Sequence, residues 1–98
     1  MVFRPDPKPE REKDEDYLDY IRHERCLIRQ VHGVDPHHLD TRGSGGSDYT
    51  AVPLIRALHT EIGQIGQRRF EAKYRVNLWK EAHRLLRRYF SSLQNPAK

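Results

Sequence analysis

A glycine- and serine-rich segment near the middle of the chain limits where regular structure can form. Three of the eight residues in 41–48 (TRGSGGSD) are glycine and two are serine, which is typical of a loop. The segment lacks the Gly-Lys-Ser/Thr ending of a nucleotide-binding P-loop, which argues against binding of ATP or GTP. The regular elements of this 98-residue chain are therefore expected on either side of the loop, and the length fits a single domain.

The residues before the loop predict one helix and one β-hairpin. Apolar and acidic residues from Asp14 to about His23 predict a short amphipathic helix with Asp14 as its cap. The β-prone run 26–31, a turn signal at His32-Gly33 and the extended pattern of 34–39 predict a hairpin. Residues 1–13 combine proline with charge and are expected to be a disordered tail, which leaves 14–95 as the single domain.

The residues after the loop predict two longer helices. Pro53 is a favourable first residue, and an apolar stripe predicts a helix from Pro53 to Ile65. A basic amphipathic helix is predicted from Asn77 to about Leu93. Together with the hairpin, these elements predict an α+β fold in which a hairpin and a helix are flanked by N- and C-terminal helices. The apolar face of the last helix comprises Leu78, Ala82, Leu85, Leu86, Tyr89 and Leu93.

Charge is distributed unevenly along the chain. Residues 1–49 carry eight Lys/Arg and eleven Asp/Glu, whereas residues 50–98 carry ten and three. The basic half predicts a polyanionic partner, although solvated helix faces would give the same count. No apolar run of about 18 residues and no signal peptide is present, so we expect a cytoplasmic protein with no membrane partner. Cys26 is the single cysteine, which excludes an internal disulfide.

Three histidines are the candidate residues for metal binding and catalysis: His37, His38 and His59. Neighbouring strand residues point to opposite faces, so only one of His37 and His38 can join the core. If His37 turns towards the following helix, it can share a metal ion with His59, while His38 acts on a nearby water. Hydrolysis of a phosphodiester needs both a base and a cation. The remaining histidines are interpreted as ordinary surface or core residues: His23, His32 and His83.

These linked motifs resemble the HNH nucleases with the ββα-metal fold, in particular the compact phage and bacterial members. The resemblance covers about 14–89 and implies a metal-dependent DNA endonuclease that nicks one strand, acting as a monomer or weak homodimer. The matching text is VDPHHL at 34–39, the loop 41–48, VPL at 52–54, His59, Gly66, Phe70 and Tyr74.

The resemblance also implies a role for individual residues. It assigns His38 as the general base and His37 and His59 as ligands of one divalent metal ion, Mn²⁺ or Mg²⁺. The partner that it implies is DNA. Four arginines would hold the DNA backbone: Arg42, Arg56, Arg68 and Arg69.

Many members of that family hold a structural zinc with two pairs of ligands, and this chain departs from the pattern. Cys26 is matched with Arg29, and the second pair falls on Ile55 and Leu58. Arginine, isoleucine and leucine are not zinc ligands. We therefore expect no structural zinc, with apolar packing in its place.

Two further departures affect the site itself. The asparagine of the motif falls on Thr50, whose hydroxyl is expected to brace the loop less well. A second helix histidine falls on Gly63, which leaves His37 and His59 as ligands, with waters or phosphate oxygens completing the set. Asp35 and Asp48 stay open as further ligands.

Two alternatives to a nuclease are left open by the sequence. A degenerate HNH domain that binds DNA without cleavage would explain the missing zinc ligands while keeping the basic half. A small helical interaction module would treat the basic helix as a protein-binding face, but it leaves the glycine-rich loop unexplained.

Overall fold

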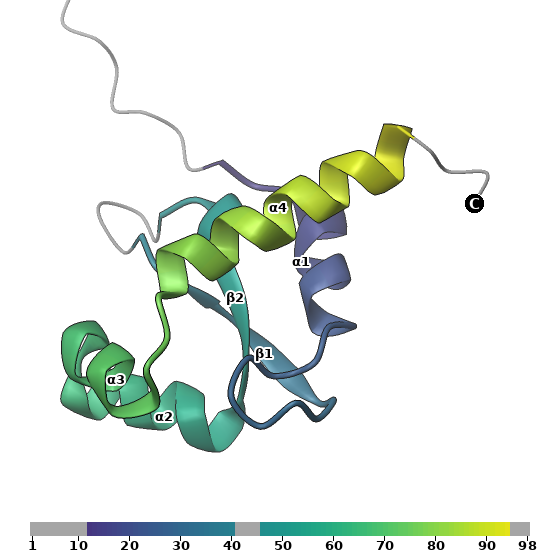
Figure 1. Ribbon diagram of the computed structural model, residues 1–98. Coiled ribbons are helices and arrows are strands. Elements are labelled where there is room, and N and C mark those ends of the chain that lie inside the picture. The colour runs from purple at the N-terminus through teal and green to yellow at the C-terminus, as the bar shows by residue number, and fades with distance from the viewer. Residues whose placement is uncertain (1–11, 41–45, 95–98) are drawn as a thin grey trace, which may run out of the picture.

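The computed structural model describes residues 12–40 and 46–94. Within these ranges the chain forms four α-helices and a two-stranded antiparallel sheet (Figure 1), which confirms the α+β class. The elements in chain order are α1 (Glu15–Arg22), β1 (Val34–His38), a 3₁₀ turn (Asp48–Thr50), β2 (Ala51–Ile55), α2 (Arg56–Ile65), α3 (Gln67–Tyr74) and α4 (Leu78–Gln94).

The sheet separates two small hydrophobic cores. Side chains alternate between the two faces of a strand. Val52 and Leu54 of β2 share one core with residues of α2 and α3, whereas Ala51 shares the other with Leu85 of α4 and residues of α1. In Figure 1, α2 and α3 lie together on one side of the strands and α4 crosses on another. The two strands thus lie between two groups of helices.

The hairpin forms with a different partner strand from the one that the sequence predicts. β1 pairs with β2, with Pro36 opposite Pro53, whereas residues 26–31 form a turn. The amide of Cys26 donates to Val31 O (2.8 Å), and Gln30 takes a left-handed backbone with φ of 58°. The prediction of a strand at 26–31 was wrong because the β-prone side chains of this segment pack on the core from a turn.

Helix α2 begins three residues later than predicted. Pro53 lies inside β2 and not at the first turn of a helix. A proline has no N–H for a strand ladder, and here the Pro53 carbonyl accepts a hydrogen bond from the Leu27 amide (3.1 Å). The end of α2 agrees with the sequence: Ile65 is its last residue and Gly66 follows with a φ of 87°, which glycine adopts without strain.

The two outer helices agree with prediction. Asp14 caps α1 by accepting a hydrogen bond from the Tyr17 amide (3.0 Å). α4 begins at Leu78, within one residue of the predicted start, and buries Leu78, Ala82 and Leu85. Leu93 was predicted on the buried face, but its side chain is exposed, because the end of α4 extends past the other elements (Figure 1).

None of the described helices is long and apolar enough to cross a membrane. Most of the predicted tail, 1–11, lies outside the described residues. Its last two residues are described, and the Glu12 carbonyl accepts a hydrogen bond from the Asp48 amide (2.9 Å).

Candidate functional site

The strand β1 delivers two histidines to opposite faces of the sheet. His37 lies opposite Val52, whose core includes α2, and His38 lies opposite Ala51, whose core includes α1 and α4. Both rings come from the end of one short strand, and the charge that His38 would carry acts on His37. The adjacent histidines therefore have different surroundings although they are close in space.

His37 meets His59 across the interface of β1 and α2. The ring centroids are 4.9 Å apart and the ring planes cross at 72°, an edge-to-face arrangement. Burial, together with the nearby charges of His59 and His38, lowers the pKa of His37 to about 4. His37 is therefore neutral near pH 7, the form of an imidazole that can donate a lone pair to a cation.

Asp35 lies beside this histidine pair. Its Oδ2 is 3.6 Å from His59 Nδ1 and 2.9 Å from Arg56 Nε. The Arg56 contact is an ion pair without hydrogen-bond geometry, because Oδ2 is buried and accepts no hydrogen bond from the described residues. A carboxylate beside Nδ1 favours the Nδ1–H tautomer of the ring and leaves Nε2 as the donor atom for a ligand.

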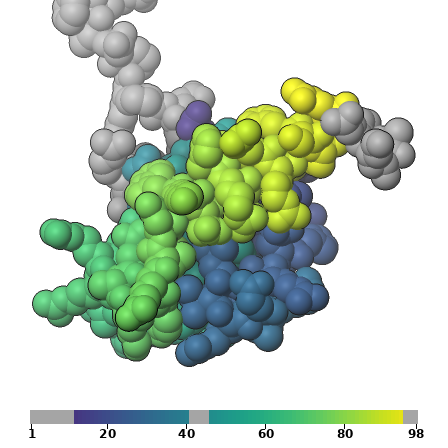
Figure 2. Space-filling model, viewed as in Figure 1, coloured from purple at the N-terminus to yellow at the C-terminus, as the bar shows by residue number. Residues whose placement is uncertain are grey.

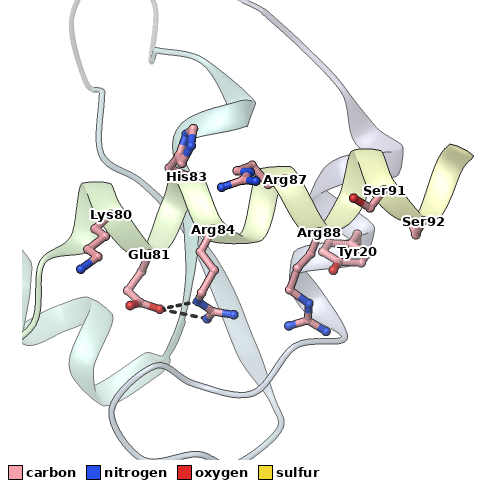
Figure 3. A pocket seen from close by; sticks show the side chains of 9 residues that line it. All are labelled: Tyr20, Lys80, Glu81, His83, Arg84, Arg87, Arg88, Ser91 and Ser92. Carbon is pink, nitrogen blue, oxygen red and sulfur yellow. Dashed lines mark hydrogen bonds and ion pairs between the residues drawn. The ribbon is translucent and has the colours of Figure 1, made fainter.

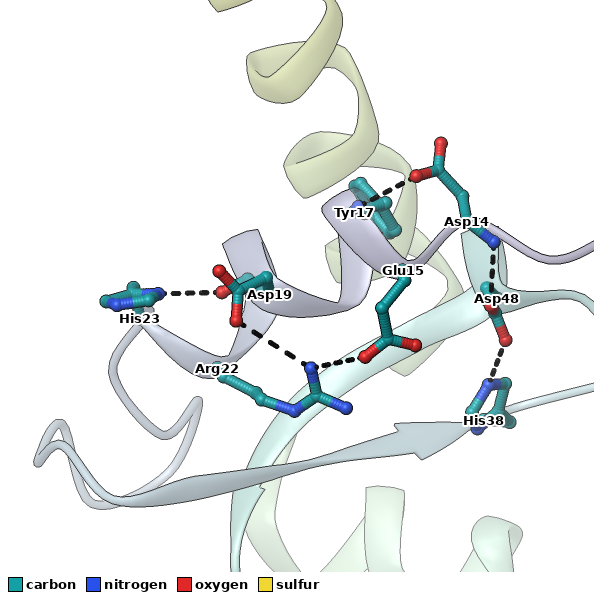
Figure 4. A network of polar contacts seen from close by, with 8 residues as sticks. All are labelled: Asp14, Glu15, Tyr17, Asp19, Arg22, His23, His38 and Asp48. Carbon is teal, nitrogen blue, oxygen red and sulfur yellow. Dashed lines mark hydrogen bonds and ion pairs between the residues drawn. The ribbon is translucent and has the colours of Figure 1, made fainter.

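His38 is paired with a different carboxylate (Figure 4). Its Nε2 lies 2.8 Å from Asp48 Oδ1, and the Asp48 side chain is only 3% exposed. An ionised carboxylate can only accept, so Nε2 carries the proton and the lone pair of the neutral ring is on Nδ1. This is the arrangement by which an aspartate orients a histidine that acts as a base.

The Asp48 carboxylate is itself held in place from α1. Its Oδ2 accepts the Asp14 amide at 2.8 Å. Asp14 is the cap of α1, and its own carboxylate accepts hydrogen bonds from the Tyr17 amide and the Tyr49 hydroxyl. The Asp14 hydrogen bond raises the pKa of Tyr49 to about 12. The cap of helix α1 thus orients the Asp48 carboxylate, which in turn orients the His38 ring.

Thr50 links the two ends of the loop. Its hydroxyl donates to Ser47 O (2.7 Å) and accepts from the Asp40 amide (3.2 Å). The Thr50 carbonyl also accepts from the Leu39 amide (3.2 Å). One threonine therefore uses its side chain as donor and acceptor together and joins residues on both sides of the loop.

Three of the four positions that the resemblance matches with zinc ligands lie in or against one core. Cys26 and Leu58 are buried in the same core, and Ile55 packs against it. The Cys26 sulfur accepts a hydrogen bond from the Arg29 amide (3.5 Å). The predicted apolar packing at Ile55 and Leu58 is confirmed.

The four arginines assigned to DNA are placed differently from one another. Arg56 pairs with Asp35 at the histidine pair, while Arg68 and Arg69 are exposed in the first turn of α3. Arg42 lies outside the described residues. Across residues 12–40 and 46–94, no three His, Cys, Asp or Glu side chains form a group that could hold a metal ion.

The sequence could not predict where the carboxylates of Asp35 and Asp48 lie relative to the histidines. Asp35 is found beside His59 and Asp48 beside His38, so each histidine of interest has its own acid. The contact between His38 and Asp48 crosses the loop, and no local pattern predicts it. The signal that was present is the period-two spacing of Asp35 and His37, which puts both on one face of β1.

Comparison with known families identifies one match. The model of a family described as "Protein of unknown function (DUF968)" matches residues 1–90, so the chain belongs to this family. No curated protein and no solved structure matches the chain.

Proposed function

We propose that this DUF968 chain is a metal-dependent DNA endonuclease of the ββα-metal type that nicks one strand. One observation carries the proposal: the end of β1 presents a buried, neutral histidine against a helix histidine, and its neighbour is oriented by a buried aspartate. The order β1, β2, α2 provides the hairpin followed by a helix that such a site requires. Phosphodiester hydrolysis needs a cation and a base, and the two halves of this cluster suit those separate tasks.

The donor set at the histidine pair fits a divalent cation. His37 and His59 would hold the ion, and the buried Asp35 oxygen beside His59 would orient that ring and add negative charge. Two imidazoles leave the remaining positions to waters and phosphate oxygens, which suits Mn²⁺ or Mg²⁺. When bound, the cation would stabilise the charge on the leaving oxygen.

The chain's own chemistry centres on His38. Its Nδ1 lone pair would take a proton from the attacking water. Asp48 would keep the ring in the tautomer with Nδ1 unprotonated and would stabilise the imidazolium that forms. Thr50 would keep the loop ends together around this pair. Asp48 is a positioning residue, because it acts through the His38 ring.

The experiment is a supercoiled-plasmid assay with Mn²⁺ or Mg²⁺ that compares the native chain with His38→Ala. We expect nicking to fall by about 100-fold or more, since a positioned base contributes about that much. His38→Gln guards against a folding artefact, and DNA binding of both variants in EDTA verifies that the fold is intact. Gln64→Ala, at an exposed residue of α2 that lies outside both sites, is the control. Nicking that persists without His38 would overturn the mechanism.

The second candidate is a DNA-binding domain that does not cleave. It is favoured by the finding that no three metal-ligating side chains group together in the described residues. Salt-dependent retardation of DNA by the native chain, with no nicking under any added metal, would establish it in place of the nuclease.

A further inference from the structure

The solvent-facing side of α4 is hollowed and basic. A groove of about 780 Å³ runs along the helix, and Tyr20 of α1 forms part of its wall (Figure 3). A second hollow of about 360 Å³ adjoins it between α4 and the segment 23–32, and Arg84 and Arg88 line both. In Figure 2, α4 lies along the blue surface of that segment. The two hollows share these two arginines and are together called here the α4 groove.

Cations outnumber anions in the α4 groove. Its two acidic side chains each pair with one arginine: Glu81 with Arg84 (2.9 Å) and Glu24 with Arg88 (3.1 Å). Among the described residues, no acid pairs with the other cations that line it. These unpaired cations are Arg25, Lys80 and Arg87.

The groups along α4 form a row. Lys80, Arg84, Arg87 and Ser91 follow one another at spacings of four, three and four residues, so they lie on one side of the helix. The row spans about 16 Å at about 1.5 Å per residue. That length matches the axial rise of about five phosphates on one strand of B-DNA.

The rest of α4 argues against a membrane as the partner. A helix that binds a lipid surface inserts its apolar face, but here the apolar face of α4 is buried on the protein through Leu78, Ala82 and Leu85. The exposed apolar residues of α4 are outside the cationic row and do not interrupt it: Trp79, Phe90 and Leu93.

We propose that the α4 groove binds the phosphate backbone of duplex DNA, with Lys80 and Arg87 as its main contacts. The inference rests on the proposed function in taking DNA as the polyanion. None of the residues that line the groove belongs to the histidine cluster, by which we mean His37, His38 and His59 with the acids beside them. The groove therefore holds the duplex away from the bond that is cut and contributes to binding more than to the chemical step.

The test measures binding of a fluorescein-labelled mixed-sequence duplex by anisotropy, in EDTA and over a range of NaCl concentrations. We expect Lys80→Gln with Arg87→Gln to weaken binding about tenfold and to lower the slope of log K against log [salt] by about 2, since each phosphate contact contributes about 0.9. The matched control is Lys13→Gln with Arg75→Gln, which removes two exposed cations that lie outside the groove and that no acid pairs with among the described residues. That control should bind within about twofold of the native chain, with an unchanged slope.

Several outcomes would overturn the inference. Equal weakening by both double variants would mean that only total charge matters. Binding to polyglutamate or to anionic vesicles that is tighter than to DNA, and that depends on Lys80 and Arg87, would assign the groove to a different partner.

The nicking assay separates this inference from the proposed nuclease. Groove-dependent binding without nicking would leave the groove standing and remove the nuclease. If the chain nicks DNA, the groove double variant should raise KM and leave kcat within about twofold, because a uniform binding contact is lost. Nicking at low DNA concentration that is unaffected by the double variant would overturn the groove alone.

Discussion

The histidine cluster and the α4 groove present polar groups in opposite ways. In the cluster, each ring is held by a neighbour: His37 by His59, and His38 by the nearly buried Asp48. In the groove, Lys80 and Arg87 are exposed side chains on one helix. A pre-organised, partly buried site suits a chemical step, where small displacements are costly. An exposed row of charges suits binding to a repeating polyanion, where position matters less.

The sharpest test of this contrast is at His59. His59→Ala should reduce Mn²⁺-dependent nicking by about 100-fold or more, as expected when a group that stabilises developing charge is lost, while duplex binding in EDTA stays within about twofold. Gln64→Ala, at an exposed residue of the same helix that lines no part of the groove, is the control and should leave the rate of nicking unchanged. The measurement is the rate of nicking against Mn²⁺ concentration. A weaker duplex affinity of His59→Ala in EDTA would show that the two regions are not separate.

The second test uses the acid sensitivity of the folded state. His37 has its pKa lowered to about 4 from an ordinary 6.5. Between these values the unfolded chain binds a proton at His37 and the folded chain does not, so the free energy of unfolding falls as pH decreases through this window. At pH 4.5 the loss is on the order of 2 kcal/mol relative to pH 7.

Urea unfolding in EDTA at pH 7 and pH 4.5 measures this loss. The native chain should lose more stability than His37→Gln over the same interval, because glutamine does not titrate. His32→Gln, at an exposed histidine, should behave like the native chain. Equal acid sensitivity of the native chain and His37→Gln would show that burial of His37 does not govern this dependence.

The smallest expected effect is a difference in duplex affinity between variants of Arg87 and Arg84 in the groove. Arg87→Gln should weaken duplex binding about threefold, as expected for one phosphate contact at moderate salt. Arg84→Gln should change it less, because Glu81 already neutralises Arg84 at 2.9 Å. The single variant Glu81→Gln, which keeps the native Arg84, should make Arg84 a stronger phosphate contact and tighten duplex binding slightly. The anisotropy measurement above reports all three variants, and a larger effect at Arg84 would contradict the assignment of the main contacts.

Local patterns predicted the elements whose apolar faces have a clear helical period. The capped helix after Asp14 and the long helix after Asn77 lie where the sequence predicts them. The signals at Pro53 and at 26–31 misled, because proline also fits a two-stranded sheet and β-prone residues can be buried from a turn. Strand pairing joins residues that are far apart in the sequence, so propensity alone could not choose between 26–31 and β2 as the partner of β1.

The candidate site was predictable in part. Adjacent histidines on a strand must point to opposite faces, and this alone predicted that one of His37 and His38 would leave the core. The structure adds the acids, which the sequence could not place. The contact of Asp48 with His38 depends on the path of the loop and on the Asp14 amide.

Residue types and their spacing were enough to predict the α+β class, the capped first helix, the basic last helix and the candidate histidines. Each of these depends on periodicity or residue type, which are local properties. Only the tertiary structure decided that β2 is the partner of β1, that His37 meets His59, and that Asp35 and Asp48 lie beside different histidines. The packing also pairs Arg84 and Arg88 with acids, whereas Lys80 and Arg87 have no acidic partner within 12–40 and 46–94. These are contacts between side chains whose separation depends on how the elements pack, and no local rule specifies that packing.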